Sequence, residues 1–378
     1  MKIQYDSIVK SSLRRVLHVT PSLSLGGTEK TAQLFATYLN KEYFNVAIWS
    51  PLSGPRADIL KNAGIPVWIN IPLESVLYRF KPHIVHLHRA GWPEPKLMRS
   101  FRGAHWFYHG AKLPKIIETN VFGRYDPSHS GTLIDKTLFV SHFCAERFSN
   151  TYKKKVPSNR YDVLYNPVDV TFIAKHTTPP EKKNFRNAVI GRLSRADKGK
   201  WSISFGLHIV PTIISQIPDL QYYIIGGIQE AYDFVNKQNL SNNIRFLPEV
   251  TTELELANYL DKLSIFVHAN DTGESFGLSI AEAMSAGLPI VTHPCLNLKD
   301  NAQTELVEHG VTGFVATSPK EYADYVTMLL KNPDVAQRMG IAGQKKAFQL
   351  FDVSLLTHKL EHIYHNLCPP NFACTIPN

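Results

Sequence analysis

Two glutamates in the stretch 273–289, Glu274 and Glu282, lie eight positions apart beside a strongly apolar segment. Carboxylates next to an apolar segment either face solvent or accept hydrogen bonds from a ligand. Earlier in the chain, Arg192 and Lys198 lie six positions apart in a glycine-bearing stretch, where neither charge needs to be buried without a partner. Two such cations suit a diphosphate, and two carboxylates suit the hydroxyls of a sugar and of a ribose. The four side chains together predict a binding site for a nucleotide diphosphate that carries a sugar.

Glycines near these residues predict backbone groups that face an anion. The stretch between the two glutamates predicts a helix that begins near Gly277, so the N–H groups of Gly277 and Leu278 would point toward a phosphate. Gly26 and Gly27 follow a predicted strand near the start of the chain and permit close approach of a ligand, although a simple turn explains them equally well. They form neither a GxGxxG fingerprint nor a P-loop.

The elements that must position these residues are short apolar runs that alternate with helix-like stretches. This alternation predicts an α/β fold with two doubly wound domains, residues 1–168 and 169–351, joined by an exposed, proline-bearing linker at 166–187. A C-terminal helix at about 352–368 is expected to pack back on the first domain. The predicted strands lie in the runs 14–22, 44–51, 65–71, 82–88, 104–110 and 136–142 of the first domain and 187–194, 220–227, 243–249, 263–269, 288–294 and 312–316 of the second. His109 lies near the end of one of these runs, where a histidine is either structural or catalytic.

Length and composition fit a two-domain protein of the cytoplasm. The chain has 378 residues, of which 44% are hydrophobic, and no run approaches the roughly 18 apolar residues of a membrane-spanning helix. The first residues lack the apolar region of a secretory signal, so we expect a reducing environment. The four cysteines have no metal-like pairing; Cys368 and Cys374 are close enough for a disulfide, but reduced thiols are the favoured interpretation.

The basic residues are concentrated in the first half of the chain. Residues 1–168 contain 23 Lys and Arg against 11 Asp and Glu, whereas the remainder contains 18 against 21. This surplus indicates either an ordinary basic surface or peripheral contact with something anionic, such as an anionic membrane or a lipid phosphate. Neither a basic helix nor an aromatic-stacking module is recognisable, so we do not expect a nucleic-acid partner.

In its motifs and their order, the chain resembles, along nearly its whole length, the retaining glycosyltransferases of family 4, the glycosyl transferases group 1. The resemblance implies the GT-B fold, in which two Rossmann-like domains face each other across a cleft. It rests on GGTE at 26–29, the histidine of WFYHG, FVSHF at 139–143, YNPVD at 165–169, GRLSRADKG at 191–199, ESFGLSIAE at 274–282 and TELVEHGVTGF at 304–314. The stretch 296–305 departs from the family because it lacks the glycine usual shortly before Glu305.

The resemblance also implies a role for each candidate residue. Arg192 and Lys198 would hold the donor diphosphate, Glu274 would contact the hydroxyls of the donor sugar, and Glu282 would hold the ribose. The other residues implied at the donor site are Ser275, Phe276, Gly277 and Leu278 near sugar and phosphate, Gly26 and Gly27 near the phosphates from the first domain, and His109 beside the sugar.

The implied function is the retaining transfer of a sugar from a UDP- or GDP-sugar to a hydroxyl of a glycan or lipid-linked acceptor. No Asp-x-Asp occurs in the chain, so we expect neither a metal nor another cofactor. The alternatives are a nucleotide-sugar 2-epimerase of the same fold, an inactive binding protein that kept the fold, and a DNA-glucosylating enzyme. The sequence leaves the nucleotide, the sugar and the acceptor open.

Overall fold

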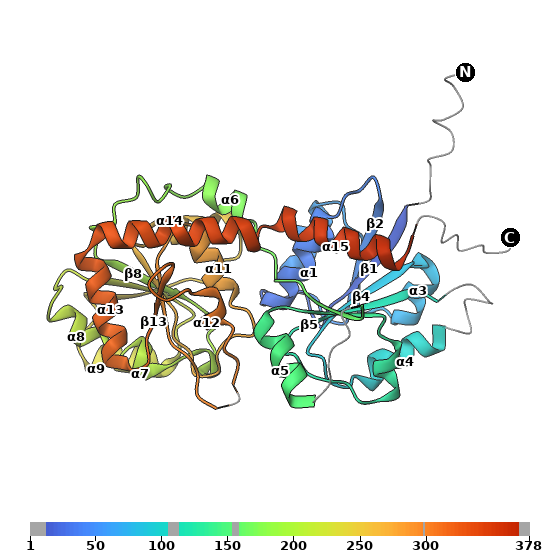
Figure 1. Ribbon diagram of the computed structural model, residues 1–378, viewed down its shortest axis with the longest axis horizontal. Helices are drawn as coiled ribbons and strands as arrows, with labels where there is room; N and C mark the ends of the chain where they lie inside the picture. The colour runs from blue at the N-terminus through green and yellow to red at the C-terminus, as the bar shows by residue number, and fades with distance from the viewer. Residues whose placement is uncertain (1–12, 105–112, 153–158, 298, 370–378) are drawn as a thin grey trace, which may run out of the picture. The chain divides into compact units, whose positions relative to one another are not determined.

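The structure is a computed structural model that describes residues 13–104, 113–152, 159–297 and 299–369. The chain divides into two compact units. Unit 1 comprises Met1–Val140, Cys144–Pro167 and Val353–Asn378, and unit 2 comprises Ser141–Phe143 and Val168–Asp352. In each unit a sheet lies among helices (Figure 1).

The described strands of unit 1 form one parallel sheet in the order β3-β2-β1-β4-β5-β6-β7. The order reverses between β1 and β4, so this unit is doubly wound. Its strands are β1 (Arg14–Val19), β2 (Phe44–Ser50), β3 (Val67–Ile69), β4 (Ile84–Arg89), β5 (Lys115–Asn120), β6 (Lys136–Phe139) and β7 (Tyr161–Val163). Its helices are α1 (Gly27–Tyr38), α2 (Arg56–Asn62), α3 (Leu73–Phe80), α4 (Pro95–Ala104), η1 (His129–Leu133), α5 (His142–Tyr152) and α15 (Val353–Leu367).

The C-terminal helix α15 completes the core of unit 1. Leu356, Leu360 and Tyr364 are at most 1% exposed and belong to the same apolar cluster as Val16 of β1 and Phe35 of α1. These three positions recur at intervals of four residues, which places them on one face of the helix. The end of the chain therefore supplies part of the interior of the unit that the start of the chain forms.

The described strands of unit 2 also form a parallel sheet, in the order β10-β9-β8-β11-β12-β13. This is the strand order of a Rossmann domain. The strands are β8 (Val189–Leu193), β9 (Gln221–Ile225), β10 (Ile244–Leu247), β11 (Ile265–Val267), β12 (Ile290–Thr292) and β13 (Gly313–Val315). The helices are α6 (Val170–Lys175), η2 (Lys198–Lys200), α7 (Ile203–Gly206), α8 (Val210–Ile214), α9 (Gln229–Lys237), α10 (Glu253–Asp261), α11 (Leu278–Ser285), α12 (Gln303–Leu306), α13 (Pro319–Lys331) and α14 (Pro333–Leu350).

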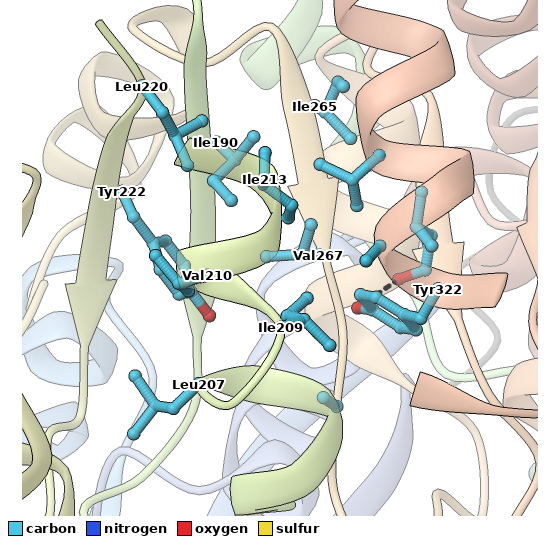
Figure 2. Packing of buried hydrophobic residues seen from close by; sticks show 14 of the residues in the cluster. Ile190, Leu207, Ile209, Val210, Ile213, Leu220, Tyr222, Ile265, Val267 and Tyr322 are labelled. Atoms are coloured by element: carbon cyan, nitrogen blue, oxygen red, sulfur yellow. Dashed lines mark hydrogen bonds between the residues drawn. The ribbon is translucent and has the colours of Figure 1, made fainter. Parts of the chain in front are cut away.

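The core of unit 2 is built mainly from branched aliphatic residues of the central strands. Figure 2 shows Ile190 of β8 and Ile265 and Val267 of β11 in the same cluster as Val210 and Ile213 of α8. All five are at most 3% exposed. Strands buried on both faces favour such residues, which is why the sequence shows these strands as short continuous apolar runs.

The prediction of two doubly wound α/β units is confirmed, but two strands of unit 1, β5 and β7, were not predicted. The run 104–110 lies outside the described residues except for Ala104, which ends α4. β5 lacks the expected apolar signal because Glu118 and Asn120 interrupt it. Glu118 is nevertheless buried, since Arg89 of β4 donates to it with 2.6 Å between Nε and Oε2.

The predicted linker at 166–187 is not an exposed linker. Val168, Val170 and Ile173 are fully buried, and α6 packs against α10, α11 and α14. Lys183 is also buried and donates to the Asp261 carboxylate at 3.1 Å. The segment from Val168 onward is therefore packed into unit 2 in spite of its polar composition and adjacent prolines, and its buried Lys183 has a partner within that unit.

The described residues contain no helix that combines the length and the apolarity needed to traverse a lipid bilayer.

Candidate functional site

The strand order of unit 2 reverses between the neighbouring strands β8 and β11. Ligands of open parallel sheets bind beyond the carboxyl ends of the strands at such a reversal. The loop that follows β8 contains η2, and the loop that follows β11 spans residues 268–277 and leads into α11. These two loops carry five of the predicted residues, namely Lys198, Glu274, Ser275, Phe276 and Gly277.

Arg192 is buried, although the sequence predicted a loop in which its charge need not be buried without a partner. It lies within β8 with 3% of its surface exposed, and its guanidinium carbon is 3.5 Å from the centroid of the Trp201 ring. Nη2 donates to Ser194 Oγ at 3.0 Å and to the Lys200 carbonyl at 2.7 Å. Nε and Nη1 are buried with no acceptor among the described residues. Burial lowers the pKa of Arg192, because a low-dielectric environment disfavours the cation.

The two lysines of the loop after β8 differ in what they contact. Lys198 has a side chain that is 78% exposed and pairs with Glu230 in the first turn of α9. Lys200 is only 25% exposed, and its ammonium lies 3.1 Å from Glu274 Oε2. Thr272 Oγ1 also donates to the Gly199 carbonyl at 2.7 Å. Lys200, rather than Lys198, therefore joins the loop after β8 to Glu274.

Three side chains surround the carboxylate of Glu274. Oε1 accepts a hydrogen bond from Asn270 Nδ2 at 2.7 Å and lies 3.3 Å from His268 Nε2, while Oε2 faces Lys200. His268 Nδ1 lies 3.0 Å from Thr292 Oγ1, whose residue is fully buried. The Glu274 side chain itself is 20% exposed, so it lies between a buried polar layer and solvent.

These contacts keep Glu274 ionised. Burial alone would raise the pKa of the Glu274 carboxyl, but the hydrogen bond from His268 and the charge of Lys200 outweigh it and lower the pKa to about 2. The group is therefore an acceptor of hydrogen bonds at neutral pH and has no proton to donate.

The backbone of Glu274 is fixed by the stretch 296–305, which departs from the family pattern. Gly273 has φ of +70°, and a Cβ there would overlap the carbonyl oxygen of Asp300. The Glu274 N–H donates to Gln303 Oε1 at 3.0 Å, and the Ala302 N–H donates to the Glu274 carbonyl at 2.8 Å. This stretch therefore supports the candidate site without the glycine that the family has there.

The start of α11 contains the remaining predicted donor residues of unit 2. Gly277 is the N-cap with φ of +106°, a left-handed conformation that favours glycine, and Leu278 is the first helical residue. Glycine offers no side chain to the first N–H groups of the helix, so an anion can approach them. Phe276 is buried, Ser275 is half-buried, and Glu282 is 5% exposed in the middle of the helix.

The residues of unit 1 that were predicted to lie near the donor provide less evidence for a binding site. Gly26 is the N-cap of α1 and Gly27 its first residue. The Glu29 carboxylate lies against Gly26 and accepts a hydrogen bond from Ser22 Oγ at 2.6 Å. A carboxylate of the chain itself therefore lies at the N-terminal end of α1. His109 lies outside the described residues.

Three buried histidines of unit 1 form a group with metal-like spacing. His18 of β1 and His86 and His88 of β4 each offer a ligand atom within 4.8 Å of the others. His18 Nδ1 lies 3.0 Å from His88 Nε2, so one of them donates to the other, and the outer nitrogens of both rings are buried without a partner among the described residues. Both ring nitrogens of His86 already have hydrogen-bond partners, since Nδ1 lies 2.6 Å from the Tyr364 hydroxyl and Nε2 lies 2.8 Å from Thr119 Oγ1. We therefore assign these histidines to the interior of the unit and not to a metal site.

Sequence reasoning did not identify Lys200, His268 and Asn270. A histidine and an asparagine at alternate positions after a buried strand are a usable signal, since both lie where a Rossmann sheet presents its ligand-binding residues. The chain contains 16 histidines, however, and only the structure shows which of them contacts a candidate carboxylate.

Comparisons with known proteins agree with the fold, and the family match among them lies within unit 2. Residues 186–332 match the family described as glycosyl transferases group 1. That range contains Arg192, both lysines of η2, Glu274 and Glu282.

Curated relatives match part of the chain at low identity. The phosphatidyl-myo-inositol mannosyltransferase of Mycobacterium leprae is 27% identical over 177 residues, which cover 46% of each chain. The N-acetyl-alpha-D-glucosaminyl L-malate synthase of Bacillus anthracis is 21% identical over 254 residues, or 64% of each chain. The chain thus spans about half to two thirds of the length of these relatives.

Solved structures match nearly the whole chain. A glycosyltransferase from Rickettsia africae has a TM-score of 0.73 at 18% identity, with coverage of 95% of this chain and 99% of that one. HepE of Anabaena in complex with UDP has a TM-score of 0.72 at 18% identity, with coverage of 93% and 100%. The chain therefore has the GT-B fold of two Rossmann-like halves. Together with the family match, these likenesses support an enzyme of the glycosyltransferase class.

Proposed function

We propose that this protein is a retaining glycosyltransferase, similar to family 4, that transfers a sugar from a UDP- or GDP-sugar to a hydroxyl of a glycan or lipid-linked acceptor. The observation that carries the proposal is a continuous set of contacts beyond the ends of β8 and β11. Arg192 donates to the Lys200 carbonyl, and the Lys200 ammonium pairs with Glu274. Two cations and a carboxylate beside the start of α11 suit a sugar joined to a diphosphate.

The leaving group needs groups that stabilise negative charge. Arg192 holds a buried positive charge within β8, and a charge in a low-dielectric environment lowers the energy of a nearby anion more than an exposed charge does. The exposed Lys198 and the N–H groups at Gly277 and Leu278 supply further positive potential. In this proposal they bind the diphosphate and stabilise the charge that develops on it.

The carboxylates receive hydroxyls and do not act as nucleophiles. Glu274, ionised and surrounded by donors, accepts a hydrogen bond from the donor sugar, and Glu282 accepts from the ribose. The acceptor oxygen attacks the anomeric carbon on the face from which the diphosphate leaves, and the sugar–phosphate bond breaks. The departing phosphate oxygen takes the proton of the acceptor hydroxyl, so configuration is retained without a covalent enzyme intermediate.

Three further features belong to the proposal. The chain contains no Asp-x-Asp to hold a metal under the diphosphate, so turnover proceeds without a divalent cation. The protein acts in the cytoplasm, and its basic first half contacts an anionic membrane that carries a lipid-linked acceptor. The named activity of the Mycobacterium leprae relative, a phosphatidyl-myo-inositol mannosyltransferase, is consistent with such an acceptor.

Thermal unfolding with nucleotides in EDTA tests the proposal. A ligand that binds only the folded state raises the melting temperature, and a concentration of about 100 times the dissociation constant adds about 2.7 kcal/mol. UDP or GDP should therefore raise it by several degrees, and the matching nucleotide sugar should release free nucleotide when acceptors are supplied. Absence of any shift with both nucleotides, or a shift that appears only when manganese replaces EDTA, would contradict the donor site or its metal independence.

A further inference from the structure

The arrangement around Glu274 determines how many hydroxyls its carboxylate can receive. A carboxylate has about four lone-pair sites, two on each oxygen. Asn270 Nδ2 lies 2.7 Å from Oε1, and His268 Nε2 lies 3.3 Å from Oε1 and from Asn270 Nδ2. When His268 carries its proton on Nε2, both side chains donate to Oε1 and that oxygen is fully occupied. Lys200 Nζ takes one site of Oε2 at 3.1 Å. One acceptor site remains, and it lies on the same oxygen that Lys200 contacts.

The protonation pattern behind Glu274 is consistent with this count. A proton on Nε2 of His268 lets that nitrogen donate to Glu274, while Nδ1 of the same ring accepts from the Thr292 hydroxyl, 3.0 Å away. His268 is 6% and Asn270 is 3% exposed, so these groups are on the buried side of the carboxylate. Lys200 and Glu274, at 25% and 20%, are the members of the set that solvent reaches.

Lys200 has donor capacity left after it pairs with Glu274. An ammonium carries three N–H donors, and those of Lys200 face Glu274 Oε2 at 3.1 Å and, at the weak distance of 3.5 Å, the Gly273 carbonyl. The remaining N–H is available to a ligand oxygen. Lys200 and Glu274 thus offer one donor and one acceptor side by side, with charges that offset each other.

We propose that Lys200 and Glu274 together bind two neighbouring hydroxyls of an uncharged donor sugar, and that Lys200 is also the residue that positions Glu274. Glu274 Oε2 accepts from one hydroxyl, and the Lys200 ammonium donates to the oxygen of the next. The offsetting charges leave no net attraction for an acidic sugar. This inference rests on the proposed function, since it specifies how the same site recognises its donor.

Lys198 gives a matched comparison for Lys200. Both lysines belong to η2, and Lys200→Met and Lys198→Met each remove one positive charge. Lys198 is 78% exposed and pairs with Glu230 instead of Glu274. Loss of Lys198 should weaken binding of the nucleotide diphosphate and of the nucleotide sugar by the same factor, because that side chain is not in contact with the sugar-binding carboxylate.

The experiment compares calorimetric affinities for UDP and GDP with those for UDP-glucose, UDP-N-acetylglucosamine and GDP-mannose. The wild type should bind one nucleotide sugar more tightly than its nucleotide alone. The gain is the ratio of the affinity for the nucleotide sugar to the affinity for the nucleotide alone. Lys200→Met should reduce this gain by about tenfold or more, as expected for a lost hydrogen bond to a charged group. Lys200→Arg should restore part of the gain, and Lys198→Met should leave the gain unchanged.

The outcomes separate this inference from the proposed function. If the wild type binds no nucleotide, the proposed function fails. If the wild type binds a nucleotide but no sugar adds affinity, or if Lys200→Met keeps the full gain, the paired recognition of hydroxyls is wrong while the nucleotide site stands. Binding of the nucleotide alone by Lys200→Met shows that the variant is folded, so a lost gain is not a consequence of unfolding.

Discussion

At the scale of single residues, the buried ionisable groups of this protein separate into those with compensating partners and those without. Glu274 remains charged because Lys200, His268 and Asn270 surround its carboxylate. His18 has no such compensation, and burial lowers its pKa to about 3. The first kind of group is suited to binding a polar ligand, and the second makes folding sensitive to acid.

The buried histidines should make unit 1 unstable in mild acid. Burial lowers the pKa of His18 to about 3 and holds the pKa values of His86 and His88 well below 6.5. The unfolded chain binds a proton at each of these histidines near pH 6.5, whereas the folded chain does not. The free energy of unfolding is therefore highest above pH 6.5 and falls as the pH drops. Between pH 6.5 and pH 5, His18 should cost about 1.5 kcal/mol, and His86 and His88 should add to that loss. Urea unfolding across that range should show a steep loss of the free energy of unfolding.

A pair of substitutions identifies the source of that loss. His18→Leu should reduce the slope of the unfolding free energy by about 1.4 kcal/mol per pH unit, because one proton fewer is taken up on unfolding. His358→Gln removes a histidine from the exposed side of α15 and should leave the slope nearly as it is. Equal slopes in the wild type and His18→Leu would show that this histidine is already protonated in the folded protein.

The sequence suggested candidate residues for a site but not the contacts that these residues make. Glu274 and Arg192 were identifiable because packing alone seldom places a carboxylate or a cation directly beside a buried strand. Their neighbours depend on which strands are adjacent, so Lys200 was passed over in favour of Lys198, although the two are only two positions apart. The sequence also did not predict that Arg192 packs on Trp201, because both lie in a stretch whose composition is typical of an exposed loop.

At the scale of elements, strands were predictable wherever apolar residues run continuously, and β5 shows where this fails. Its polar Glu118 is buried because a cation from the adjacent β4 pairs with it, and no property of the segment alone reveals that pairing. Loops are set by similar contacts between distant segments. The loop before α11 holds its shape because Gly273 lies against the backbone of Asp300.

Gly273→Ala tests the loop before α11. A left-handed φ of +70° costs a residue with a Cβ about 1–3 kcal/mol, and overlap with the Asp300 carbonyl adds to that cost. Gly310→Ala is the control, because Gly310 has a similar φ of +79° but nothing within 4 Å of the added Cβ. Gly273→Ala should therefore lower the free energy of unfolding more than Gly310→Ala, and only Gly273→Ala should weaken binding of the nucleotide sugar. Equal effects of the two variants would mean that the Asp300 contact does not shape the site.

At the scale of the whole molecule, each unit has its own parallel sheet and its own apolar cluster, yet the chain enters unit 1 twice. Residues up to 167 form most of unit 1, and α15 returns to complete it after unit 2 has been built. Solved structures share this fold at 18% identity, which indicates that patterns of burial preserve it where individual residues do not. Stability of unit 1 should therefore depend on a helix that lies far from the rest of that unit in the sequence.

Leu360→Ala tests this dependence. Leu360 is fully buried in the cluster of unit 1, and loss of such a side chain typically costs about 2–5 kcal/mol. Leu355 belongs to the same helix but is 36% exposed, so Leu355→Ala should cost much less. Hydrogen exchange measured segment by segment should show that Leu360→Ala reduces amide protection in β1 and β4 of unit 1 while β8 and β11 of unit 2 keep theirs, since compact units with separate cores open separately. An equal loss of protection in both sheets would show instead that the two units unfold as one cooperative block.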